Sequence, residues 1–274
     1  MCIVYFFLYC THIMSEIHPE LASKYDKQNV RDWWMSEKLD GVRAWWCNGK
    51  LYSREGNMFY SPPYFTEKFP DITLDGELFM GKGRFQDCVG TVKRHQPTEA
   101  WKELQFVVFD APHIESSFEN RLTKARERIA EMEDCTYIRL LEQVKCTGPE
   151  SVKTLLSQIE SEGGEGVMLR HPTALYNPYG KRTSNLLKVK TMHDAEAVVI
   201  GHEAGKGKHL GRLGALLCTV KEDPTKKFKI GTGFTDEERT NPPEIGSTVT
   251  YRYFELTKGG IPRFPAYIRV RKDY

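Results

Sequence analysis

The sequence predicts an α+β protein with two domains, and three observations lead to this class. The chain has 274 residues, of which 40% are hydrophobic and 28% charged, so it is long enough and apolar enough to form a sizeable core. As far as LLKVK, which ends at Lys190, short strand-like runs alternate with amphipathic helical patterns. From Ala195 onward, strand-like segments follow one another between Gly and Pro turns, without a long helical pattern.

The first elements expected in the mixed domain are strands. In VRAWWCNGKLYSREG, Asn48 and Gly49 separate two apolar runs, which is a strong signal for a β-hairpin. DITLDGELFM and LQFVVFDAP read as strands that end in polar turns, whereas EGVMLRH and LLKVK read as shorter strands. Together these segments supply the strands of the first domain.

Two helices are expected between these strands. SFENRLTKARERIAEMED is charged and amphipathic, and its apolar residues share one helix face: Leu122, Ala125, Ile129 and Met132. GPESVKTLLSQIESEGG is a second helix, which Pro149 begins and Gly163 and Gly164 end. Helices interspersed with strands in this way are typical of an α+β domain.

The C-terminal part reads as a small β-barrel. Its strand-like segments are AEAVVIGH, GALLCTVK, KFKIGTG, TVTYRYFEL and AYIRVR. Five strands in about 80 residues match the size and pattern of an OB-fold. We place the boundary near Thr191–Asp194, so that the first domain covers residues 14–191 and the second covers residues 192–274.

Residues 1–13 fit neither domain. MCIVYFFLYC is an apolar run of about ten residues, which is too short to span a bilayer as a helix. It lacks the basic n-region of a secretory signal, and CTHIM is a poor cleavage site. Met14 opens a polar stretch that reads like an ordinary start. Three interpretations stay open: an upstream start, a degenerate signal or an ordered apolar arm.

Charge and cysteine content narrow the class further. The net charge of +2 gives no global basic signature. The seven cysteines are odd in number and form no CxxC pair, which argues against a zinc site and a disulfide framework. Reduced thiols favour a cytoplasmic location, and a periplasmic one follows if residues 1–13 belong to a degenerate signal. Because the sequence contains no oligomerising heptads or repeats, we expect a monomer. We also expect no membrane partner.

The stretch MSEKLDGVRAWW carries charges between strongly apolar flanks. A buried lysine is unfavourable unless it pairs with a carboxylate or loses its proton. A desolvated lysine near another cation has a lowered pKa and becomes a nucleophile, which makes Lys38 a candidate. Asp40 and Arg43 could orient a substrate phosphate or sugar. The structural alternative is a buried Lys–Asp pair or a hairpin with exposed charges.

Further charged and aromatic residues follow in a fixed order. They are Arg54 in SREG, Glu77 in LDGELF, Phe109 in FVVFD, Glu165 in GGEGVMLR, and Arg182, Lys188 and Lys190 in YGKRTSNLLKVK. We expect Lys188 and Lys190 to share one strand face. Each residue has a structural alternative, such as a satisfied core acid or a solvated strand face. The whole set in this order would require several independent coincidences.

This set of motifs resembles the covalent nucleotidyltransferase superfamily and, within it, the minimal ATP-dependent DNA ligases, especially the small bacterial E type. EKLDGVR resembles the KxDGxR nucleophile motif, SREG motif Ia, LDGEL motif III, FVVFD motif IIIa, EGVMLR motif IV and LLKVK motif V. GKGKHLGRLGALL and RFPAYIRVRKDY resemble the OB domain of the smallest ligases. The resemblance implies a nucleotidyltransferase (adenylation) domain of antiparallel sheets with helices, followed by the OB-fold domain.

The resemblance also implies a reaction. Lys38 would attack the α-phosphorus of ATP and form a lysyl–AMP intermediate, with release of pyrophosphate. AMP would move to the 5′-phosphate of a nick in double-stranded DNA, and the 3′-hydroxyl would displace it. Asp40 would help to align the reactive ends. No segment clearly matches the long latch hairpin of some viral ligases.

Other roles follow from the same resemblance. The residues expected to contact ATP are Glu37, Arg43, Arg54, Glu77, Phe109, Arg182, Lys188 and Lys190. Glu165 and Glu77 would hold a divalent metal, Mg²⁺ or Mn²⁺. The residues expected to contact DNA are Arg43, Arg54, Lys206, Lys208 and Arg212. Arg269 and Arg271 lie where a terminal family motif assists the reaction with ATP.

Three alternatives remain at this point. An RNA ligase and a GTP-dependent mRNA-capping guanylyltransferase use the same lysine chemistry on other nucleic-acid ends. A degenerate, non-catalytic DNA-binding module would need no nucleophile. The joint presence of Lys38, Glu77, Glu165, Lys188 and Lys190 argues against such a module.

Overall fold

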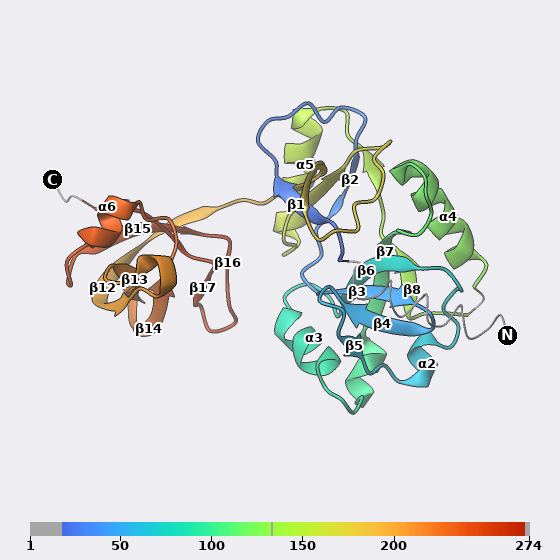
Figure 1. The fold of residues 1–274 in the computed structure, drawn as a ribbon, viewed down its shortest axis with the longest axis horizontal. Coiled ribbons are helices and arrows are strands. Elements are labelled where there is room, and N and C mark those ends of the chain that lie inside the picture. Colours follow the sequence, from blue (N-terminus) through green and yellow to red (C-terminus); the bar gives the residue numbers. More distant parts are fainter. Residues whose placement is uncertain (1–17, 133, 272–274) are drawn as a thin grey trace. The chain divides into compact units, whose positions relative to one another are not determined.

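The computed structural model describes residues 18–132 and 134–271, and its internal contacts divide the chain into two compact units (Figure 1). The first unit is Met1–Val189 and the second is Lys190–Tyr274. The boundary expected from the sequence, after residue 191, lies two residues further along. Residues 1–13, with their three open interpretations, lie outside the described residues. Among the helices that are described, none has both the length and the apolar character needed to cross a membrane.

A six-stranded sheet forms one half of the first unit, in the order β5-β4-β3-β6-β7-β8. Its strands are β3 (Val42–Cys47), β4 (Lys50–Ser53), β5 (Met58–Phe59), β6 (Leu74–Phe79), β7 (Gln105–Asp110) and β8 (Ile138–Leu140). Neighbours are antiparallel except β7 and β8. The β3–β4 hairpin is confirmed, and its turn residues Asn48 and Gly49 have φ of 50° and 75°. A two-residue turn with positive φ fits the twist of the paired strands.

A five-stranded sheet forms the other half, in the order β1-β11-β10-β2-β9. Its strands are β1 (Leu21–Lys24), β2 (Trp34–Glu37), β9 (Val144–Lys145), β10 (Val167–Arg170) and β11 (Arg182–Val189). Only β1 and β11 are parallel among these pairs. Lys188 and Lys190 were expected on one strand, but β11 ends at Val189 and contains only Lys188. Val189 pairs with Val167, the first residue of β10, so Lys190 follows the end of the β11 ladder.

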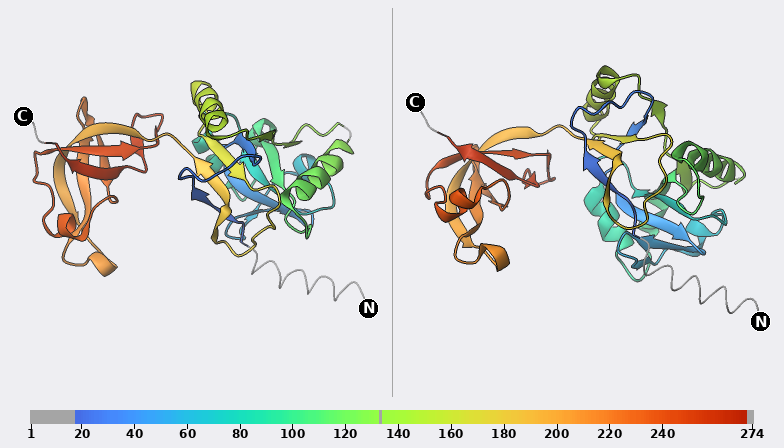
Figure 2. Two further views of the ribbon diagram at one scale, coloured as in Figure 1. Left: turned by 90° about the horizontal axis from the view of Figure 1, so that it is seen from above. Right: turned by 45° about the horizontal axis from the view of Figure 1, so that its top comes forward.

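Each sheet of the first unit has helices packed beside it (Figures 1 and 2) and a core of its own. The helical segments are α2 (Pro63–Thr66), α3 (Phe85–Val92), η1 (Glu99–Glu103), α4 (Phe118–Ala130) and α5 (Pro149–Ser161). The predicted face of α4 is confirmed, since Leu122 and Ala125 are buried. In α5, Val152 and Ile159 join the core of the five-stranded sheet. Among the described residues, the two larger core clusters of the first unit thus lie one on each sheet, and a smaller cluster contains Leu39, Val107 and Leu141.

The second unit contains the five strands expected from the sequence, in the order β14-β13-β12-β15-β18. They are β12 (His193–Ala204), β13 (Leu213–Val220), β14 (Asp223–Ile230), β15 (Thr248–Tyr253) and β18 (Ala266–Val270). The shorter elements are η2 (Gly207–His209), α6 (Asp236–Thr240), β16 (Glu255–Leu256) and β17 (Pro262–Arg263).

The edges of this sheet meet at one point. A single parallel bridge joins Thr232, just after β14, to Ala266 of β18. The backbone N–H of Tyr267 donates to the carbonyl oxygen of Thr232 at 2.8 Å. Within the described residues, the sheet therefore curls into an OB-like shape that no continuous ladder closes into a barrel (Figure 2).

Candidate active site

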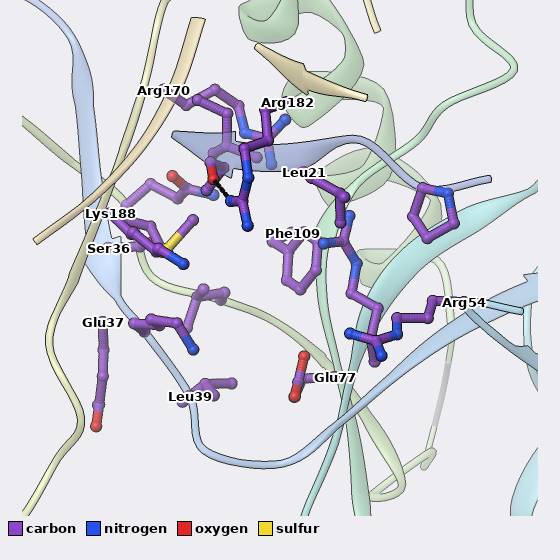
Figure 3. Close-up of a pocket in the computed structure, with 18 residues that line it drawn as sticks. Leu21, Ser36, Glu37, Leu39, Arg54, Glu77, Phe109, Arg170, Arg182 and Lys188 are labelled. Carbon is purple, nitrogen blue, oxygen red and sulfur yellow. Dashed lines mark hydrogen bonds between the residues drawn. The ribbon is translucent and has the colours of Figure 1, made fainter. Parts of the chain in front are cut away.

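A pocket of about 330 Å³ lies in the first unit and is lined from both of its sheets (Figure 3). The predicted site residues that line it are Glu37, Lys38, Arg43, Arg54, Glu77, Phe109, Arg182 and Lys188. Its other lining residues include Leu21 and Ala22 of β1 and Met168 and Arg170 of β10. A cavity of this volume is in the range of small-molecule sites.

Lys38 follows β2 directly and is held at both its backbone and its side chain. Its backbone N–H donates to the carbonyl oxygen of Gly166 at 2.8 Å. Its ammonium forms an ion pair with the Glu165 carboxylate, and the two side chains are 26% and 9% exposed. A carboxylate oxygen of Asp40 lies within 4.8 Å of one of Glu165. The antiparallel pairing of β2 with β10 thus brings the lysine and two acids together.

The loop after Lys38 has no room for a side chain at Gly41. A Cβ atom at this position would lie 2.3 Å from the carbonyl oxygen of Leu78 and 2.8 Å from Cγ of Glu77. Any larger residue would push the loop away from β6, because the closer contact is with backbone. The glycine therefore lets the segment after Lys38 pass directly over the strand that carries Glu77.

Glu77 and Phe109 lie on the side of the pocket formed by the six-stranded sheet (Figure 3). Burial raises the pKa of Glu77 to about 7, although the charges of Lys38 and Arg43 oppose this shift. The guanidinium carbon of Arg43 lies over the Phe109 ring, 4.9 Å from the centroid of that ring. This wall of the pocket therefore combines an aromatic face with a carboxyl group that titrates near neutrality.

Cations gather on the opposite wall, formed by β11 (Figure 3). Arg182 Nη1 donates to the carbonyl oxygen of Ala22 at 2.5 Å. Burial lowers the pKa of Lys188, and the charges of Arg182 and Lys38 lower it further.

Arg54 is 64% exposed and pairs with Glu55 at 2.5 Å. Arg54 was expected on a strand, but it lies in the β4–β5 turn, because the Ser53 N–H bonds to Asn57 and closes the chain there.

Behind the pocket lies a buried ionic network that sequence reasoning missed. It contains three carboxylates and three guanidinium groups, those of Glu20, Asp75, Asp110, Arg43, Arg121 and Arg170. Arg170 Nη1 bonds to Glu20 Oε1 and to Asp110 Oδ2, each at 2.9 Å. Buried charges are unfavourable unless they are paired and hydrogen-bonded, and this network meets both conditions with equal numbers of opposite charges.

Arg43 belongs to this network as well as to the pocket. Its Nε and Nη2 atoms bond to the two Asp75 oxygens at 2.7 and 2.5 Å, and the Tyr176 hydroxyl donates to Asp75 at 2.7 Å. Asp75, Asp110 and Arg170 lie within the motifs LDGEL, FVVFD and EGVMLR. Their place in these motifs was the sequence signal that could have identified them as part of the site. Glu20 and Tyr176 carried no such signal.

The remaining predicted residues belong to the second unit. The ammonium of Lys190 lies 5.1 Å from the ring centroid of Phe254. Lys206 and Lys208 are exposed between β12 and β13, and Arg212 Nη1 lies 3.7 Å from an oxygen of Asp236. Arg269 pairs with Thr250 in the β15–β18 ladder, and Arg271 forms an ion pair with Glu196.

Comparisons with known proteins agree with this geometry. A family model described as an ATP dependent DNA ligase domain matches residues 14–190, and one described as a DNA ligase OB-like domain matches residues 204–271. A DNA ligase of Haemophilus influenzae is 39% identical over 252 residues, which are 92% of this chain and 91% of that relative. The chain therefore belongs to the ATP-dependent DNA ligase family.

Two solved structures place the fold within this family. A structure of a Lig E DNA ligase, described as binding DNA with a minimal scaffold, has a TM-score of 0.87 and 36% identity. The match covers 93% of this chain and 99% of that one. The Chlorella virus DNA ligase-adenylate shares the fold at a TM-score of 0.54 and 24% identity, over 94% of this chain and 99% of that one. The architecture is thus that of a minimal ligase of the Lig E type.

Proposed function

We propose that this enzyme seals nicks between 5′-phosphate and 3′-hydroxyl ends in duplex DNA, through AMP carried on Lys38. The observation that carries the proposal is the position of Lys38. Its ammonium is paired with Glu165 at a pocket that also holds Phe109 and the cations of β11. A nucleophile, an aromatic face and phosphate-neutralising groups in one cavity suit nucleotidyl transfer from ATP.

The first step joins Lys38 to AMP. The Lys38 ammonium gives up a proton to solvent, and its Nζ forms a bond to the α-phosphorus of ATP. The bond from that phosphorus to the bridging oxygen breaks, and pyrophosphate leaves with the electron pair. Arg182 and Lys188 neutralise phosphate charge, and Phe109 stacks on adenine. Glu77 accepts from a ribose hydroxyl, and Glu37 lines the wall beside Lys38.

The residues beside Lys38 also fit a divalent metal. The carboxylates of Asp40 and Glu165 approach within 4.8 Å, and hard cations such as Mg²⁺ and Mn²⁺ prefer carboxylate oxygens. Glu165 would be the principal ligand, with Asp40 beside it and Glu77 as a further candidate. When bound, the ion would supply positive charge against the phosphates of ATP.

The later steps act on DNA. AMP passes from Lys38 to the 5′-phosphate, and attack by the 3′-hydroxyl oxygen forms the phosphodiester and releases AMP. Arg43 and Arg54 are proposed to hold the nick phosphate, with Asp40 aligning the ends. Lys206, Lys208 and Arg212 are proposed to contact DNA phosphates. Arg269, Arg271 and Lys190 are proposed to assist the reaction with ATP, and the working protein is proposed to be a monomer.

One assay tests this function. The protein is incubated with ATP labelled at the α-phosphate and Mg²⁺, then with a nicked duplex that bears a 5′-phosphate. A labelled protein band followed by a joined strand is the expected result. A labelled band without joining would favour an RNA ligase, and labelling by GTP alone would favour a guanylyltransferase. No labelled band would mean a DNA-binding module without catalysis.

A further inference from the structure

The loop that carries Glu165 has little side-chain packing of its own. It links α5 to β10 through the sequence Glu162-Gly163-Gly164-Glu165-Gly166. Gly163 has a φ of +78°. A Cβ atom on Gly164 would lie 2.5 Å from Cγ2 of Ile159 and 2.6 Å from Oε1 of Glu37. Because Gly163 and Gly164 have no side chains, the position of Glu165 depends on backbone bonds, such as that from the Lys38 N–H to the carbonyl oxygen of Gly166, and on groups that reach the loop from outside.

Lys82 reaches this loop from the other half of the first unit. It lies between β6 and α3, flanked by Gly81 and Gly83, both of which have positive φ. Its ammonium is 2.8 Å from Oε2 of Glu162 and 3.5 Å from Oε1 of Glu37. Glu162 is the C-cap residue that follows α5, and Glu37 immediately precedes Lys38. One cation thus joins the two segments that carry Glu165 and Lys38.

The charges around Lys82 explain why a cation is useful there. The carboxylates of Glu37 and Glu162 lie beside Lys82, that of Glu165 pairs with Lys38, and ATP would add further negative charge. Lys82 offsets two of these carboxylates, and the hydrogen bond to Glu162 raises the pKa of Lys82. Its side chain is 29% exposed and that of Glu162 is 52% exposed, so the pair adds little to folding stability. Any effect of Lys82 is therefore expected in the placement of the loop.

We propose that Lys82 is a positioning residue for nucleotidyl transfer. By holding Glu162 and Glu37, it fixes the loop that sets Glu165 against Lys38. The reaction named here rests on the proposed function, whereas the anchoring of the loop does not.

Three variants test the effect on the reaction: Lys82→Met, Lys82→Arg and, as a matched control, Lys153→Met. Lys153 makes a similar ion pair with Glu150 on α5, at 2.7 Å, and lines no part of the pocket. In single-turnover formation of lysyl–AMP, Lys82→Met is expected to lower the maximal rate about tenfold, since small misplacements slow such reactions. The ATP concentration at half-maximal rate should change little. Lys82→Arg should recover most of the rate, and Lys153→Met should match the wild type.

The proposal would be overturned if Lys82→Met changed the half-saturating ATP concentration instead of the maximal rate. An unchanged maximal rate with a raised half-saturating ATP concentration would mean that Lys82 contacts phosphate directly. The variant Glu162→Gln separates the two cases further. Positioning through Glu162 predicts that Glu162→Gln reproduces part of the loss and that the double variant is no slower than Lys82→Met. Independent, additive effects would contradict it.

A readout that does not depend on activity completes the test. Amide hydrogen exchange of residues 162–166 is measured in the wild type, Lys82→Met and Lys153→Met. We expect faster exchange in Lys82→Met alone, because the loop has lost its outside anchor. Unchanged exchange would overturn the anchoring whatever the kinetic result. If the wild type formed no lysyl–AMP, the proposed function would fail, and the exchange experiment would still decide whether Lys82 anchors the loop.

Discussion

The cations of the pocket differ from those of the β12–β13 turn in burial and in fixed partners. Lys38 pairs with the mostly buried Glu165, and Arg43 donates hydrogen bonds to both carboxylate oxygens of Asp75. Lys206 and Lys208 are exposed on a glycine-rich turn. Preorganised charges suit chemistry on a phosphorus atom, whereas exposed charges suit salt-dependent contact with a phosphate chain. We therefore propose that the two units use the same residue types for different tasks.

The largest effect that separates these tasks is expected for Lys38→Ala. Without its nucleophile the enzyme should form no detectable lysyl–AMP, a loss of at least about a thousandfold. Sealing of a nick that already carries AMP bypasses this step and should fall less than about tenfold. The two rates are measured with labelled ATP and with a pre-adenylated duplex. Formation of the ATP adduct by Lys38→Ala would show that another residue is the nucleophile.

Glu165→Gln should give the next largest effect. Its carboxylate pairs with Lys38 and is the proposed principal metal ligand, so lysyl–AMP formation should fall about a hundredfold. The Mg²⁺ concentration for half-maximal rate should rise as well. A magnesium titration that matches that of the wild type would count against the metal role of Glu165.

Glu77→Gln tests whether the pocket carboxyl is buried as strongly as its geometry indicates. Burial raises the pKa of Glu77 in the folded state from 4.5 to about 7, so its contribution to stability is complete below pH 4.5. That contribution is lost as the pH rises through 7. Relative to Glu77→Gln, the wild type should lose about 2 kcal/mol of unfolding free energy between pH 5.5 and 8.

Urea denaturation of the wild type and of Glu77→Gln at the two pH values measures this loss. The amide group that the substitution introduces has the size of the carboxyl group but does not titrate in this range, so other groups cancel in the comparison. A difference between the two proteins that stays constant with pH would contradict the raised pKa.

The smallest effect is expected for the triple substitution Lys206→Ala, Lys208→Ala and Arg212→Ala. Affinity for a nicked duplex should fall about tenfold, and the slope of log affinity against log salt should fall by about 2 to 3. Lysyl–AMP formation should not change. Lys226→Ala, which removes the ion pair with Asp223 in the same unit, is the control. An unchanged salt slope would remove this turn from the DNA contact surface.

Local sequence patterns predicted the elements more completely than the site. The Asn48-Gly49 turn, the apolar face of α4 and the five strands of the second unit follow from short-range rules, and all are confirmed. The resemblance to the ATP-dependent DNA ligases and the OB-like unit are confirmed by the family comparison. Ends of elements were less predictable, as Arg54 and Lys190 show, because the partner strand decides where a ladder stops.

Long-range pairing is what the sequence did not supply. Lys38 and Glu165 are separated by 127 positions, and Glu20 and Arg170 by 150. No periodicity links such pairs, so the carboxylate beside Lys38 was assigned by resemblance and the buried network was missed. The bonds from Arg170 to Glu20 and Asp110 depend on how the two sheets of the first unit pack together. That packing is a tertiary property rather than a local one.

We propose that nucleotidyl transfer begins on Lys38 in the pocket of the first unit. The direct test is to incubate the protein with ATP and Mg²⁺, digest it, and locate AMP by mass spectrometry of the peptides. We expect AMP on Lys38 and on no other residue, with loss of the adduct in Lys38→Ala. AMP on a different side chain, or an adduct that survives this substitution, would contradict it.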